Sequence, residues 1–187
     1  MKPTINWVFL LLENDNNEIL LITENNDNNR PWKKHGQFSV PAGTIDEYEN
    51  IEQTIHREFQ EETWLNGLAT IVEETLKEIG ELFLETEEYK LYGRVYKGKI
   101  PITTQEKVKN FSSEEVGKVQ VMHPEYILNQ ATESIRPGLL EVLLLKHNIS
   151  SDTVYIENGI YRDLDQAKEK VSQLKQLYNN AETECCS

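Results

Sequence analysis

Three glutamates near the middle of the chain have the types and the spacing of a metal-binding site. Glu58, Glu61 and Glu62 stand at positions i, i+3 and i+4 of the segment 51–63, whose periodicity predicts a helix. The apolar stripe of that helix is formed by Ile51, Ile55 and Phe59. At about 100° per residue, Glu58 and Glu62 fall at the border of the stripe rather than opposite it. Carboxylates there are partly desolvated, which is costly unless a cation meets them.

The cation that neutralises these carboxylates could be a side chain or a metal ion. Arg57 lies closest to Glu61 on the helical wheel, and one arginine cannot balance three carboxylates. Mg²⁺ can, because it prefers oxygen ligands from a few carboxylates together with substrate phosphates. An acidic triplet at this spacing is also common on solvated helices, where Arg and Lys neighbours stabilise it. The spacing alone leaves a metal site and a charged surface helix as alternatives.

The longer segment 43–65, GTIDEYENIEQTIHREFQEETWL, resembles the signature of the Nudix (MutT-like) hydrolase family. That signature reads Gly, five residues, Glu, seven residues, Arg-Glu, an apolar residue, any residue, Glu-Glu, any residue, Gly, and an apolar residue. The positions in register are Gly43, Glu49, Arg57, Glu58, Phe59, Glu61, Glu62 and Leu65. Trp64 stands where the family has Gly, so we expect the helix end to differ, with Asn66-Gly67 as the alternative turn. The resemblance extends loosely over residues 5–147.

The resemblance implies an enzyme that uses Mg²⁺ or Mn²⁺ to cleave a phosphoanhydride in a nucleoside diphosphate linked to another group. Carried over by position, Glu58 and Glu62 are the first metal ligands, and Glu61 is a further one. The backbone carbonyl of Ala42 would be another ligand, and Gly43 would let that backbone approach closely.

Other acidic and basic positions of the family carry over as well. Arg57 would orient the carboxylates through a salt bridge, and Glu49 would tie the loop to the helix start. The family's remaining acid, a ligand or general base on a later loop, corresponds better to Glu115 than to Glu114. Glu115 could equally be an exposed loop acid, and Glu58 is the competing base.

A basic cluster precedes the signature and is the candidate substrate-binding loop. It contains Arg30, Lys33, Lys34 and His35, with Trp32 among them. Lysine and arginine there could bind phosphate while the aromatic ring stacks on a base. A solvated basic loop with Trp32 packed on the sheet is the alternative.

The sequence gives no marker of substrate subclass. Family members that act on ADP-ribose carry a proline, and those that act on diadenosine polyphosphates a tyrosine, at a set interval after the signature. Residues 80–83 are Gly-Glu-Leu-Phe, so neither marker is present, and signatures for coenzyme A or NADH are not visible either. We expect a small nucleoside diphosphate derivative as substrate.

Strand-like and helix-like segments around the signature predict an α+β fold, and the resemblance implies an α/β/α sandwich with a mixed central sheet. The expected strands are 5–13, 18–24, 37–40, 68–76, 81–86, 89–97 and 117–122, and the expected helices are 51–63, 124–130 and 137–147. The first two strands should form a hairpin, and Pro41 should end the third before a loop at Ala42 and Gly43.

Two units of unequal size are expected. Residues 1–148 should form the Nudix domain, and 149–187 a C-terminal helical extension with a strand and an Asn158-Gly159 turn. The apolar stripe of the last helix is formed by Leu164, Val171, Leu174 and Tyr178. Because such a stripe does not stay in water, the extension should pack on the domain or form a homodimer.

Composition excludes several classes of partner. The chain has 187 residues and a formal net charge of −13, from 19 Lys and Arg against 32 Asp and Glu. Duplex nucleic acid, capped RNA and anionic membranes require a basic surface, so they are disfavoured. No signal peptide or transmembrane helix is expected, and Cys185 and Cys186 fit reduced thiols in a cytoplasmic protein.

Two functional hypotheses remain from the sequence. The first is a metal-dependent Nudix hydrolase that acts on acid anhydrides. The alternative is a catalytically silent Nudix-fold regulator that binds a nucleotide or a protein. Silent members usually lose an acid of the Arg-Glu-x-x-Glu-Glu core, whereas Glu58, Glu61 and Glu62 are all present here, which favours the enzyme.

Overall fold

The computed structural model describes residues 2–25, 30–63 and 74–184. Its strands are β1 (Thr4–Glu13), β2 (Ile19–Glu24), β3 (Phe38–Ser39), β4 (Ala42–Thr44), β5 (Lys77–Glu85), β6 (Lys90–Lys99), β7 (Val116–Met122), β8 (Val154–Glu157) and β9 (Ile160–Tyr161). Its helices are α1 (Ile51–Thr63), α3 (Thr104–Val108), α4 (Pro124–Leu128), α5 (Leu139–Lys146) and α6 (Leu164–Glu184), with a 3₁₀ turn at Thr132–Ser134. In this part of the chain, no helix combines the length and apolar character needed to cross a membrane.

The sheet is mixed and centred on β1. Its order is β3-β2-β1-β6-β5-β8-β9, and two further strands pair off this path, β4 with β1 and β7 with β2. β1 runs parallel to β6 over its whole length and antiparallel to β4 at Trp7 to Phe9. The expected hairpin of β1 and β2 is joined at one register pair only, Glu13 with Ile19. Beyond that pair β2 diverges to β7 and β3, and the edge of β1 that it leaves is taken by β4.

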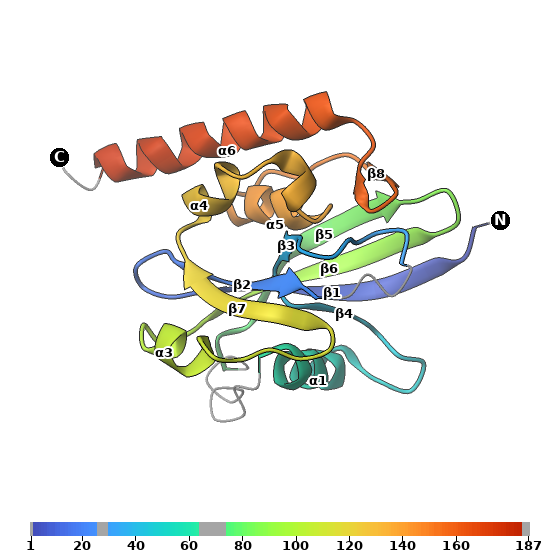
Figure 1. The fold of residues 1–187 in the computed structure, drawn as a ribbon, viewed down its shortest axis with the longest axis horizontal. Helices are drawn as coiled ribbons and strands as arrows, with labels where there is room; N and C mark the ends of the chain where they lie inside the picture. The colour runs from blue at the N-terminus through green and yellow to red at the C-terminus, as the bar shows by residue number, and fades with distance from the viewer. Residues whose placement is uncertain (1, 26–29, 64–73, 185–187) are drawn as a thin grey trace.

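Alternate residues of β1 belong to two separate cores. Trp7, Phe9 and Leu11 belong to the core that also contains residues of α4, α5 and α6. Val8, Leu10 and Leu12 belong to the other core, with residues of α1 and α3. A strand buried on both faces requires helices on both sides, and Figure 1 shows α4, α5 and α6 on one face and α1 and α3 on the other. The α/β/α sandwich is thus confirmed.

Three segments differ from the sequence expectation. Ala42–Thr44 is a strand rather than a loop, because Pro41 ends β3 while its carbonyl oxygen accepts a 2.9 Å hydrogen bond from the Leu10 amide and carries the chain across to β1. α3 was not expected, since its five residues are too short for a periodic signal. Most of the strand expected over 68–76 lies outside the described residues, and Glu74 and Thr75 are helical.

The segment from residue 149 onward packs against the rest of the chain. β8 adds to β5 in parallel, and Asn158 and Gly159 link it to β9 with φ of 51° and 75°. A tight hairpin needs positive φ at both positions, which Asn and Gly tolerate. α6 lies over α4 and α5 (Figure 1) and buries Leu174 and Tyr178, and Lys170 reaches Glu141 at 2.8 Å.

Truncating the buried face of α6 should destabilise the fold. Leu174 is 0% exposed, so Leu174→Ala removes packed methyl groups and should lower the free energy of unfolding by about 2–5 kcal/mol in urea titrations. Gln173→Ala, one residue earlier on the exposed face, should change it by less than about 0.5 kcal/mol. Equal midpoints for wild type and Leu174→Ala would mean that α6 is not packed in solution.

Candidate functional site

Helix α1 carries the glutamates, and its first turn fixes where they face. Asn50 Oδ1 accepts a hydrogen bond from the Gln53 amide, and Gln53 Oε1 accepts one from the Asn50 amide, both at 2.9 Å. This reciprocal capping pair starts the helix where the sequence indicated. Because Phe59 is buried, the neighbouring Glu58 and Glu62 are drawn in with it, and each is only 8% exposed.

The backbone of β4 lies directly against these two carboxylates. Glu62 Oε2 accepts a 2.9 Å hydrogen bond from the Ala42 amide. A Cβ atom at Gly43 would lie 1.7 Å from Cδ of Glu58, so a side chain there would require Glu58 to move. Glycine at position 43 is therefore a steric requirement of the Glu58 position, and β4 forms one wall of the site.

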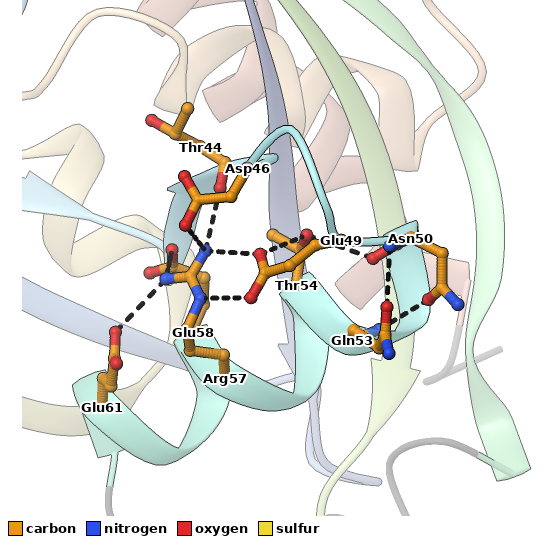
Figure 2. Close-up of polar contacts among 9 residues, drawn as sticks. All are labelled: Thr44, Asp46, Glu49, Asn50, Gln53, Thr54, Arg57, Glu58 and Glu61. Atoms are coloured by element: carbon orange, nitrogen blue, oxygen red, sulfur yellow. Dashed lines mark hydrogen bonds and ion pairs between the residues drawn. The ribbon is translucent and has the colours of Figure 1, made fainter.

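Arg57 is the centre of the ion-pair network shown in Figure 2. Its Nε and Nη2 donate to the two carboxylate oxygens of Glu49 at 2.8 and 2.9 Å, and Nη2 also donates to the Thr44 carbonyl oxygen at 2.9 Å. Nη1 donates to Glu58 at 2.5 Å and to Glu61 at 3.3 Å. The hydrogen bonds from Arg57 lower the pKa of Glu49 to about 2. Arg57 thus links the loop before α1, β4 and two of the glutamates.

The buried carboxylates remain short of positive charge. Burial raises the pKa of Glu58 despite the opposing Arg57 charge. Burial, and then the charges of Glu58 and Glu24, raise the pKa of Glu62 well above its ordinary value. An added cation would relieve this repulsion, since it favours the ionised form of both groups.

The donor chemistry fits a hard divalent cation, although the ligands are not preassembled. In residues 2–25, 30–63 and 74–184, no three His, Cys, Asp or Glu side chains are grouped closely enough to hold a metal ion as they stand. Arg57 occupies one oxygen of Glu58 and the Ala42 amide occupies one oxygen of Glu62. Within the described chain, the second oxygen of each accepts no hydrogen bond. These two oxygens and exposed Glu61 provide the all-oxygen ligand set that Mg²⁺ prefers.

The glutamates face a cavity of about 210 Å³. Glu115 lines it from the loop before β7, and its negative charge contributes to raising the pKa of Glu58. Of the basic loop, Arg30, Trp32 and Lys33 line the same cavity. Lys34 is exposed and does not line it, and its side chain lies beside Gly159 instead.

Trp32 is packed on the sheet, which was the alternative to a base-stacking position. Its ring meets Trp7 and Tyr89 edge-on, with centroids 5.5 and 5.6 Å apart, and the Arg30 guanidinium carbon lies 5.3 Å from the ring centroid. It is a buried residue. Trp32 therefore serves as the support of the basic loop.

The turn between β8 and β9 also supports this loop. The Gly159 amide donates to the Pro31 carbonyl oxygen at 2.9 Å, and Gln37 Nε2 donates to the Gly159 carbonyl oxygen at 2.8 Å. A Cβ atom at Gly159 would lie 2.8 Å from the Lys33 backbone. The C-terminal segment is thus in contact with the wall of the cavity.

Glu24 and Arg136 are two site residues that sequence reasoning missed. Buried Glu24 ends β2 and pairs with Lys33 at 2.9 Å and with Arg136, which lines the cavity just before α5. Glu24 is the last residue of an otherwise apolar strand-like run, and Arg136 belongs to no recognisable motif. The only local signal is a charged residue at the end of an otherwise apolar strand.

Comparisons with known proteins are consistent with this arrangement. A family model described as NUDIX domain matches residues 3–143. The MutT protein from Methanosarcina mazei Go1 has a similar structure, with a TM-score of 0.56 and 23% identity over 78% of this chain and 93% of that one. The NUDIX domain of Shewanella oneidensis NrtR complexed with ADP ribose is also similar, with a TM-score of 0.58 and 16% identity over 79% of this chain and 89% of that one. A NUDIX hydrolase from Nitrosomonas europaea has a TM-score of 0.55 and 18% identity over 79% of this chain and 90% of that one. No curated protein sequence matches the chain.

Filling the space at Gly43 should disturb the site selectively. Gly43→Ala forces Glu58 or β4 to move and should lower the free energy of unfolding by about 1–3 kcal/mol, measured in urea. Gly117→Ala in β7 is the matched control, because the nearest atom to its added Cβ is 3.5 Å away, an ordinary contact. Its stability should stay within about 1 kcal/mol of wild type. Two variants of equal stability would show that Glu58 does not lie against β4.

Proposed function

The chain belongs to the NUDIX family, and from that membership we propose that it is a metal-dependent hydrolase of a nucleoside diphosphate linked to another group. The family assignment makes it a pyrophosphohydrolase, an enzyme that acts on acid anhydrides in phosphorus-containing compounds. The observation that carries the metal dependence is the pair of buried carboxylates, Glu58 and Glu62, which line the cavity and each have one oxygen that accepts no hydrogen bond from the described residues.

Four groups of the chain would hold Mg²⁺ or Mn²⁺ in this proposal: the side chains of Glu58, Glu61 and Glu62 and the backbone carbonyl of Ala42. When bound, such an ion supplies charge neutralisation of the diphosphate and lowers the pKa of a coordinated water. Arg57 orients Glu58 and Glu61 through its hydrogen bonds, and Glu49 fixes Arg57 in turn.

Proton transfer needs a carboxylate that is not fully occupied by other partners. Glu115 and Glu58 both line the cavity, and either can accept a proton from a water there. Arg57 already holds one oxygen of Glu58, which favours Glu115 as the general base. Arg30 and Lys33, on the basic loop, supply positive charge for the phosphates.

The proposed substrate class is small nucleoside diphosphate derivatives. The NUDIX domain of NrtR was solved with ADP ribose, so this compound belongs in the test panel. The other members are nucleoside triphosphates, nucleotide sugars and dinucleoside polyphosphates. Release of phosphate or of a nucleoside monophosphate from any of them in the presence of Mg²⁺ tests the proposal directly.

Divalent metal should stabilise the folded protein. Because Glu58 and Glu62 repel each other, a cation that binds the native state raises its stability by mass action. Millimolar Mg²⁺ or Mn²⁺, with and without a nucleoside diphosphate, should therefore raise the melting temperature measured by calorimetry. A melting temperature unmoved by either ion at all concentrations would contradict the metal site.

Neutralising one buried carboxylate should slow hydrolysis without unfolding the protein. Glu62→Gln keeps the side-chain shape and removes one charge, so kcat should fall by about 10²-fold or more, the scale of losing one transition-state contact. Glu52→Gln on the same helix is the control, since Glu52 is exposed and outside the signature, and its rate should stay within about twofold. Equal activity of Glu62→Gln and wild type would place the chemistry elsewhere.

A further inference from the structure

Arg136 is a buried cation on the wall of the cavity that the α1 carboxylates also line. It is 3% exposed and precedes α5, and it lines the same cavity as Glu58 and Glu62. Its Nη1 donates to Glu24 and lies 3.5 Å from Ser39 Oγ. Its guanidinium carbon lies 4.8 Å from the centroid of the Trp7 ring, within the range of a cation–π contact.

Most of the hydrogen-bond donors of Arg136 meet no acceptor in the part of the chain that the structure describes. A guanidinium group carries five N–H donors. Among the residues that the structure describes, those on Nε and Nη2 meet no acceptor, and the buried Nε1–H of Trp7 beside them has none either. Because Arg136 lines the cavity, an acceptor for these donors would have to come from a ligand or from water in the cavity.

The charge of this wall indicates which acceptors it takes. Glu24 is the shared counter-ion of Arg136 and Lys33, at one carboxylate for two cations. This group of residues consequently keeps an excess of positive charge, while Glu58, Glu62 and Glu115 line the same cavity. An anionic ligand in the cavity would meet the arginine donors, and a metal ion would join it to the carboxylates.

We infer that Arg136 binds an anionic phosphoryl oxygen of the substrate through its free Nε and Nη2 donors. This rests on the proposed function, which it deepens by naming the residue that recognises the diphosphate. The planar fork of an arginine matches phosphate oxygens in a way that a lysine does not. The cavity volume of about 210 Å³ lies below the range of about 300–1,000 Å³ typical of drug-sized ligands, which suits phosphoryl groups rather than a whole nucleoside.

The first test separates substrate binding from turnover. Arg136→Lys keeps the charge opposite Glu24 and removes the fork, so KM should rise by about tenfold while kcat changes by less than about threefold. Arg162→Lys is the matched control, because Arg162 is exposed outside the cavity, and both constants should stay as in wild type. An unchanged KM for Arg136→Lys overturns the inference.

A second variant separates ligand binding from neutralisation of Glu24. The double variant Glu24→Gln/Arg136→Met removes the buried charge pair as a unit and so avoids an uncompensated carboxylate. Glu24→Gln alone is its reference, because Glu24 also pairs with Lys33. If Arg136 only balances Glu24, the double variant has the KM of Glu24→Gln, and the inference is wrong. If Arg136 binds phosphate, KM of the double variant is higher than that of Glu24→Gln although the fold is retained in circular dichroism.

Calorimetric titration with inorganic pyrophosphate in the presence of Mg²⁺ tests the inference independently of hydrolysis. If Arg136→Lys binds pyrophosphate more weakly than wild type by about fivefold or more, the inference is supported. That result stands even if no substrate of the panel is cleaved, and in that case only the proposed function fails. Equal affinity of wild type and Arg136→Lys, or no binding by wild type at millimolar pyrophosphate, overturns the inference while any measured hydrolysis stands.

Discussion

Glu58 and Glu62 are buried side by side against the β4 backbone, although each loses hydration there and each repels the other. This arrangement is possible because the helix is anchored by its apolar face and the backbone of β4 leaves room for the carboxylates. Phe59 anchors α1 in the core, and a side chain at residue 43 would overlap Glu58. The fold thus holds like charges together, and the remaining features of the site serve to make that tolerable.

Charge compensation is divided between two separate groups of residues. On one side Arg57 binds Glu49 through both oxygens and still reaches Glu58, so that the loop before α1 is bound to the helix. On the other side Glu24 holds two cations, Arg136 among them, toward the cavity. Neither group cancels the charge of the site completely. The cavity is left with a strong field between an acidic and a basic wall, which suits a ligand made of phosphates and a cation.

How much of this could be predicted from sequence depended on whether the signal was local. The start of α1 and the burial of Glu58 and Glu62 follow from capping chemistry and helical periodicity, which act within a few residues. β4 could not be foreseen, because its three residues become a strand only where β2 leaves β1. The pair of Glu24 and Arg136 is separated by 112 positions, and no pattern in one chain links them. The helical wheel places Arg57 beside Glu61, whereas its long side chain also donates hydrogen bonds to Glu58 and Glu49.

The contact between the Asn158-Gly159 turn and the basic loop sets an order for assembly during synthesis. Gln37 and Gly159 are 122 positions apart, and their hydrogen bond cannot form until Gly159 has been synthesised and has left the ribosome exit tunnel. Most strands of the sheet can pair earlier, since β1 to β7 lie ahead of that point in the chain. The wall that carries Lys33 is therefore among the last parts of the molecule to reach its final arrangement, and a nascent chain that stops short of β9 has the acidic wall of the cavity without a fully supported basic one.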